Sequence, residues 1–167
     1  QTVSPIGTTT YTVTGTTGNC TSTSTVTVTV LPANAIQCAC PNAPPVTFTN
    51  PLASQILAYY GVPQTVAGQS FSVVGTLAVD VDINFVSTTI NFAPNAEIWV
   101  GTGTTLQILD NSLLYACSDM WEGIFAFGPN KHVVVSLSTI KHMKQGVYIS
   151  GGATLQSLDS KYHDNYV

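Results

Sequence analysis

The chain has 167 residues, of which 44% are hydrophobic and only 7% are charged, and its formal net charge is −4. All four basic residues are lysines, so the chain lacks the basic surface that nucleic acids require. The longest apolar runs, such as Ile124 to Phe127, are far too short to cross a membrane. The chain begins with Gln1 and shows no signal peptide, so we interpret it as a mature or excised segment.

Residues 1–32 are rich in Thr and predict an antiparallel hairpin. Thr8–Thr14 and Thr21–Val30 each alternate in character, and Gly15–Asn19 supplies a turn. The second strand carries valines on one face and threonines on the other. Because a lone hairpin is only marginally stable, we expect its apolar face to pack against a partner. The residues predicted to serve this assembly are Thr8, Tyr11, Val13, Val26, Val28 and Val30.

The same stretch resembles part of a known module. Ser4–Thr14 followed by Cys20–Val30 is similar to the last two strands of the immunoglobulin-like (PKD-like) modules of Bacteroidota surface proteins. The resemblance implies secretion and display at the cell surface. The earlier strands of such a module are missing, together with the usual cysteine partner. Either the chain is cut from a longer polypeptide, or the hairpin completes the sheet of another subunit.

Residues 33–70 predict a Pro-rich connector with one short helix. Asn50 has the character of an N-cap, Pro51 that of a first helical residue and Gly61 that of a residue just past the end. We expect this amphipathic helix to cover the N-terminal end of the domain that follows, because an uncovered terminal coil is a template for aggregation.

Residues 71–167 carry a loose repeat, in which a small or Gly turn precedes an apolar pair and a β-branched run. Its anchor positions lie 29, 27 and 22 residues apart and are Leu77, Leu106, Val133 and Leu155. A period in this range, built from short strands without a helical pattern, predicts a parallel β-helix of about four coils. The fold class predicted for the whole chain is therefore all-β.

Three strings within this domain are similar to coils of the right-handed parallel β-helix modules of secreted Bacteroidota proteins. They are Phe92–Val100, Cys117–Ile124 and Asp164–Val167. The second string is the most specific, but it is a signature of fold and carries no chemistry. The resemblance implies a right-handed β-helix in an extracellular protein.

The four cysteines are Cys20, Cys38, Cys40 and Cys117. The spacing of Cys38 and Cys40 does not suit zinc, and no His lies near enough in sequence to complete a site. Disulfides formed in an oxidising compartment are favoured, and we predict that Cys20 pairs with Cys38 or Cys40. Reduced, buried cysteines are the alternative.

Several acidic side chains are candidates for chemistry. Asp80 and Asp82 lie two apart and could contact Ca²⁺, but two carboxylates supply too few of the oxygens that this ion needs. Asp110 and Asp159 occupy matching places in their coils, with Leu137 at that place in the coil between them. The row of carboxylates is thus broken, which favours solvated turns.

Two further groups complete the candidates. His163 and Asp164 could act as an acid and base, but no nucleophile is oriented beside them, so hydrogen-bonded surface positions are favoured. Trp99 is in phase with Glu97 and should be exposed, whereas Trp121 should be buried. An exposed Trp99 would suit a contact with a carbohydrate or a protein.

We therefore expect a non-catalytic, extracellular structural module of a bacterial cell-surface or filament protein, which needs no cofactor and no metal. It would assemble through strand pairing and contacts between solenoid ends, with other copies of itself or with the rest of a longer surface protein. The first alternative is an adhesin or glycan-binding module. The second is a polysaccharide-degrading β-helix enzyme, which would lose turnover on alanine substitution of Asp110, Asp159 or His163.

Overall fold

A computed structural model describes residues 9–17, 20–28, 44–117 and 119–165, and the chain divides into two units, residues 1–37 and 38–167. In the first unit, β1 (Thr9–Thr17) and β2 (Cys20–Val28) pair in antiparallel register. This confirms the predicted hairpin. Of the residues predicted to serve assembly, Thr8 and Val30 lie outside the described residues, as does the side chain of Val28.

One face of the hairpin carries apolar side chains. Tyr11 lies opposite Val26, and Val13 follows on the same face opposite a serine. Val13 and Val26 are 61% and 53% exposed. On the other face, the hydroxyls of Thr10 and Thr27 are hydrogen-bonded at 2.9 Å. The hairpin therefore has one polar face and one apolar face, and much of the apolar face is open to solvent.

The second unit is a β-solenoid of about five turns, built from three walls of parallel strands. Wall 1 contains β4 (Thr65–Ala67), β7 (Ile83–Val86), β10 (Thr105–Leu109), β13 (His132–Ser136) and β16 (Thr154–Leu158). Wall 2 contains β3 (Thr47–Thr49), β5 (Ser70–Val74), β8 (Thr89–Phe92), β11 (Leu113–Ala116), β14 (Thr139–Lys141) and β17 (Lys161–His163). Wall 3 contains β6 (Thr76–Val79), β9 (Glu97–Val100), β12 (Gly123–Phe127) and β15 (Val147–Ser150).

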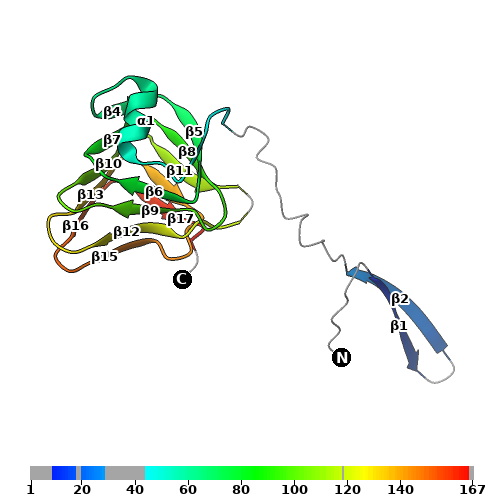
Figure 1. Ribbon diagram of the computed structural model, residues 1–167. Coiled ribbons are helices and arrows are strands. Elements are labelled where there is room, and N and C mark those ends of the chain that lie inside the picture. Colours follow the sequence, from blue (N-terminus) through cyan, green and yellow to red (C-terminus); the bar gives the residue numbers. More distant parts are fainter. Residues whose placement is uncertain (1–8, 18–19, 29–43, 118, 166–167) are drawn as a thin grey trace. The chain divides into compact units, whose positions relative to one another are not determined.

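Each turn of the chain passes through wall 1, wall 2 and wall 3 in that order (Figure 1). The parallel β-helix predicted from the repeat is thereby confirmed, with about five turns where four were predicted. The strands β3 and β4 lie within the segment 33–70 that was interpreted as a connector. Pro44 and Pro45 precede β3, and Pro51 and Pro63 lie between β3 and β4, so no proline lies within either strand.

The register corrects one part of the predicted repeat. Leu106, Val133 and Leu155 stack in wall 1 as expected. Leu77 does not join them, because it lies in wall 3 opposite Ile98, and the residue that stacks on Leu106 is Ile83. The reason is a corner at residues 80–82, which separates β6 from β7.

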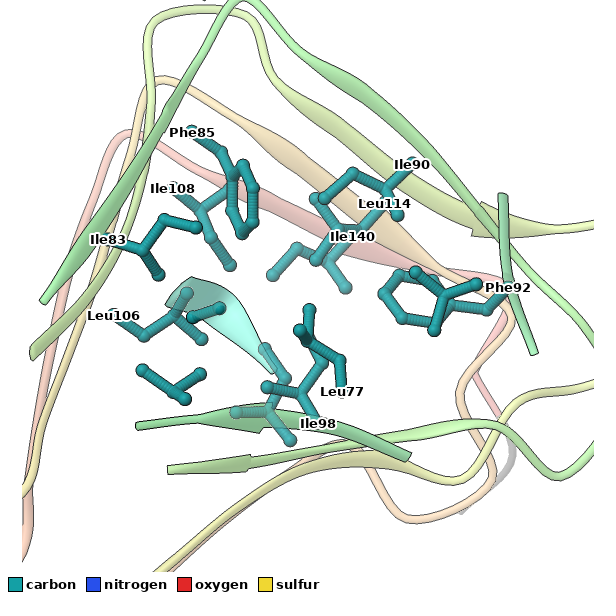
Figure 2. Close-up of a cluster of buried hydrophobic side chains, with 14 of the residues drawn as sticks. Leu77, Ile83, Phe85, Ile90, Phe92, Ile98, Leu106, Ile108, Leu114 and Ile140 are labelled. Atoms are coloured by element: carbon teal, nitrogen blue, oxygen red, sulfur yellow. The ribbon is translucent and has the colours of Figure 1, made fainter. Parts of the chain in front are cut away.

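Apolar side chains from all three walls fill the interior (Figure 2). Every second residue of each central strand points inward, as the period of a β-strand requires. The inward side chains that are fully buried include Leu77, Ile83, Phe85, Ile90, Ile98, Leu106, Ile108, Leu114 and Ile140. Trp121 is also fully buried, stacks on Phe92 at 4.2 Å and donates its indole N–H to the carbonyl of Lys141 at 2.9 Å. Its predicted burial is confirmed.

Helix α1 (Ala53–Tyr60) covers one end of the solenoid, beside β4 and β6 (Figure 1). Its inward face is buried and joins the core through Ala53, Ile56 and Leu57. Gly61 ends the helix with a φ of 66°, as predicted. Asn50 is not the N-cap and Pro51 is not the first helical residue, because the helix begins at Ala53 with Leu52 as its N-cap. The side-chain oxygen of Asn50 instead accepts the backbone N–H of Thr76 at 3.0 Å. The covering role predicted for the helix is confirmed.

Candidate functional site

The outer face of wall 3 carries a row of aromatic side chains. Trp99 lies in register with Phe125, and Phe125 lies in register with Tyr148 on the next coil. Phe127 is two residues beyond Phe125 and so points to the same face. We call Trp99, Phe125, Phe127 and Tyr148 the aromatic strip. Trp99 is 40% exposed and Tyr148 is 51% exposed, which confirms the predicted exposure of Trp99.

The rings of the aromatic strip contact one another in sequence. Trp99 and Phe125 have centroids 5.5 Å apart and planes inclined by 24°. Phe127 lies 5.2 Å from Trp99 and 5.3 Å from Tyr148, with planes inclined by 56° and 57°. Phe125 is covered by its neighbours and is only 7% exposed. The strip is therefore a continuous aromatic surface along three coils, with exposed rings at both ends.

Few charged or bulky groups surround the strip. Glu97 is the single charged residue in the four strands of wall 3, and it accepts the hydroxyl proton of Thr76 at 2.9 Å. Ala78 precedes Trp99 in the same row. The side chain of Ala78 is too small to cover the Trp99 ring, which is 40% exposed.

Of the four residues of the aromatic strip, only Trp99 was predicted from the sequence to be exposed. A signal was present, since Phe125 follows Trp99 by 26 residues and Tyr148 follows Phe125 by 23. Both spacings fall within the 22 to 29 residues of the repeat. To predict from these spacings that the rings stack, the lengths of the corners must also be known. Those lengths determine which residues of successive coils lie in register.

Asp80 has a structural role in this fold. Its carboxylate accepts the backbone N–H of Ser54 at 2.9 Å and the hydroxyl of the same residue, so it caps the first turn of α1. Partial burial raises the pKa of Asp80, but these hydrogen bonds outweigh the burial and hold the pKa below its usual value. The carboxylate that was a candidate for Ca²⁺ is thus occupied by the helix.

Asp82 is likewise engaged with the backbone. It accepts the N–H of Thr105 at 2.7 Å from the next coil. Asp80 and Asp82 line a shallow depression of about 590 Å³ at this corner. Among the described residues, no group of three or more His, Cys, Asp or Glu side chains is arranged to hold a metal ion.

Asp110 and Asp159 lie at equivalent corners between wall 1 and wall 2, as their matching positions in the repeat predicted. The corner residues Ser87, Asp110, Leu137 and Asp159 all have φ between 48° and 50°. Asp and Asn tolerate this left-handed conformation better than most residues. The backbone geometry of the corner is therefore a sufficient reason for an aspartate at these places.

The histidines of the last coils form a small polar cluster. His163 donates to Asp164 at 2.7 Å, which lowers the pKa of that carboxyl group. His142 approaches the same carboxylate at 3.9 Å and also bonds the carbonyl of Ala116. All of these carboxylate contacts come from His side chains at the surface. Lys144 points elsewhere, to Glu122 at 3.0 Å.

The predicted pairing of Cys20 is wrong, because Cys20 is a free and exposed thiol. It lies in the hairpin unit, whereas Cys38 belongs to the second unit. Cys38 and Cys40 lie outside the described residues.

Comparisons with known proteins add no relatives: no family model, no curated protein and no solved structure matches this chain. No helix among the described residues is long and apolar enough to span a membrane.

Proposed function

We propose that this chain is a non-catalytic structural module of a bacterial cell-surface or filament protein, which assembles with further copies of itself. The observation that carries the proposal is the coil formed by β16 and β17. Among the described residues these strands are outermost in their walls. Leu155 and Tyr162 occupy inward-facing rows but are 42% and 39% exposed, and the outward-facing Leu158 is 56% exposed. A strand at the edge of a sheet can accept another strand, either from another copy or from the rest of a longer surface protein.

The hairpin supports the same proposal. Its apolar face, with Val13 and Val26 exposed, is one that two strands alone do not bury. A third strand or a second sheet would cover it. The sequence resemblance to the last strands of an immunoglobulin-like module suggests that the covering strands come from another copy or from the rest of a longer surface protein.

The extracellular location rests on chemistry and on the resemblance to secreted Bacteroidota modules. Cys117 is disulfide-bonded, and disulfides persist mainly in oxidising compartments.

The absence of catalysis is part of the proposal. It is favoured because Asp110 and Asp159 are separated by Leu137 at equivalent corners, so their carboxylates are not on adjacent coils.

Electron microscopy and light scattering of the full chain at rising concentration test the proposal. The Cys20→Ser background removes adventitious linkage through the free thiol. We expect regular oligomers, and we expect the double variant Leu155→Lys, Leu158→Lys to remain monomeric, because charges would then lie on the outermost coil. The matched control is Leu137→Lys, since Leu137 is 52% exposed one coil inward. A wild-type chain that stays monomeric throughout would overturn the proposal.

A binding module is the second candidate, and the exposed aromatic strip is the observation that favours it. Wild-type monomers that adhere to a surface polymer would support this candidate over assembly.

A further inference from the structure

We infer that the aromatic strip is a binding surface for uncharged polysaccharide whose flat sugar faces stack on Trp99 and Tyr148. The inference goes beyond the structural role proposed above and does not depend on it. It starts from the fact that the strip is not needed to fill the core. Directly behind it, Leu77, Ile98 and Ile124 are fully buried and complete the interior of wall 3.

A second wall of the same solenoid shows that the fold does not require aromatic residues outside. The outward row of wall 1 that stacks in the same manner is mainly polar and consists of Thr65, Asn84, Gln107, Val134 and Gln156. The strands that carry the two rows are paired by the same kind of parallel backbone hydrogen bonding. The aromatic rings of wall 3 therefore expose apolar surface to water, whereas the polar row of wall 1 does not. Exposed apolar patches commonly mark binding surfaces.

Charge selects the class of ligand. Glu97 is the single charged residue in the strands of this wall, and Lys144, at the corner before β15, is paired with Glu122 at 3.0 Å. The strands themselves therefore offer no cation to an acidic polysaccharide or a nucleic acid. Protein–protein interfaces are typically enriched in arginine as well as in aromatic residues. This chain has no arginine. A neutral ligand is the one that these side chains complement.

The spacing and the chemistry of the aromatic rings narrow the class of neutral ligand further. The face of an aromatic ring is electron-rich, so it attracts the slightly positive C–H groups on the flat side of a pyranose. Trp99 and Tyr148 are two coils apart, which places them about 10 Å from one another along the solenoid. The indole N–H and the phenol hydroxyl at the ring edges can reach sugar hydroxyls. These features suit β-1,4-linked chains of neutral pyranose, whose C–H groups lie on their broad faces.

Retention on insoluble polysaccharide tests the inference. Monomeric chain is mixed with microcrystalline cellulose, with chitin and with an anionic polygalacturonate gel, and the bound fraction is measured. We expect retention on cellulose or chitin and not on the anionic gel. We expect Trp99→Ala and Tyr148→Ala each to weaken retention about ten-fold, as truncation of a central aromatic contact commonly does. The matched control Gln107→Ala, on the outer face of wall 1, should bind like the wild type.

Fluorescence provides a second readout on soluble oligosaccharides of the same sugars. Trp121 is fully buried while Trp99 is 40% exposed, so a ligand-induced change in tryptophan emission reports on Trp99 and should vanish in Trp99→Phe. Circular dichroism confirms that each variant is folded. Lack of retention on both neutral polymers would overturn the inference. Retention that Trp99→Ala leaves unchanged would do so too, as would an effect of that variant on self-association alone.

Discussion

At the end of the solenoid that helix α1 covers, the inward side chains Val66 of β4 and Phe71 of β5 are 1% and 0% exposed, whereas at the other end the inward side chains Leu155 and Tyr162 are 42% and 39% exposed. The two ends are built from the same apolar repeat. What differs is the element that lies over them. At one end a helix covers the outermost coil, and among the described residues no element covers β16 and β17 in this way.

The comparison shows where the apolar repeat contributes free energy. Full burial of an aliphatic side chain stabilises a protein by about 1.5–3 kcal/mol, and an exposed one contributes little of this. Leu155 and Leu106 occupy equivalent places in wall 1, but Leu106 is fully buried. A residue at a core position of the repeat thus becomes a core residue only if a further coil or a cap covers it.

Removing the side chain at the covered end should have the largest effect. We expect Ile56→Ala to lower the free energy of unfolding by about 2–5 kcal/mol, since Ile56 is fully buried and its loss leaves a cavity. Denaturant unfolding followed by circular dichroism measures the change. The control Val81→Ala, at a 37% exposed corner position, should be nearly neutral. Equal effects of the two variants would contradict the description of α1 as a cap.

Weakening the contact between Asp80 and α1 should have a moderate effect on the free energy of unfolding. Asp80→Asn keeps an acceptor for Ser54 but removes the charge at the start of the helix, so we expect a loss of about 1 kcal/mol at pH 7. Because the pKa of Asp80 is lower in the folded chain than its ordinary 3.8, the stabilisation is present above that pH and is lost as pH falls further.

Unfolding measured at pH 7 and at pH 3 separates these contributions. The difference between wild type and Asp80→Asn should shrink at the lower pH, because pH 3 lies below the ordinary pKa of the carboxyl group and the stabilisation is lost progressively below it. Asp110→Asn, at a corner with left-handed backbone, is the control and should not reproduce this behaviour. A difference that is constant with pH would show that the charge of Asp80 does not stabilise the helix.

The smallest effect is expected at the exposed end. Leu155→Ala should lower the stability of the monomer by less than about 1 kcal/mol, because Leu155 occupies an inward-facing row but is 42% exposed. The same unfolding experiment at low protein concentration measures it. A loss comparable with that of Ile56→Ala would mean that Leu155 is covered, and the contrast between the two ends would disappear.

The sequence was sufficient to predict the hairpin, the solenoid and the covering helix because each depends on a local pattern. Alternation predicts strands, and Gly61 marks the end of the helix. The phase of Trp99 relative to Ile98 and Val100 predicted its exposure. These features require no knowledge of which residues stack on which.

The parts that could not be predicted depend on the corners. The corner at residues 80–82 changes wall, so Leu77 falls out of the row in which the repeat had placed it. For the same reason, the aromatic strip depends on which residues stack between coils. It cannot be recognised from single residues such as Phe125. Asn50 had the character of an N-cap, but a contact with Thr76, 26 residues away, determines its role.

Hydrogen exchange of the backbone amides in β16 and β17, measured as a function of protein concentration, tests the central claim most directly. If another copy adds a strand to this coil, these amides should become protected as concentration rises, while those of β10 remain protected throughout. Leu155→Lys, Leu158→Lys should abolish the concentration dependence. Exchange in β16 and β17 that is the same at every concentration would contradict assembly through this end of the solenoid.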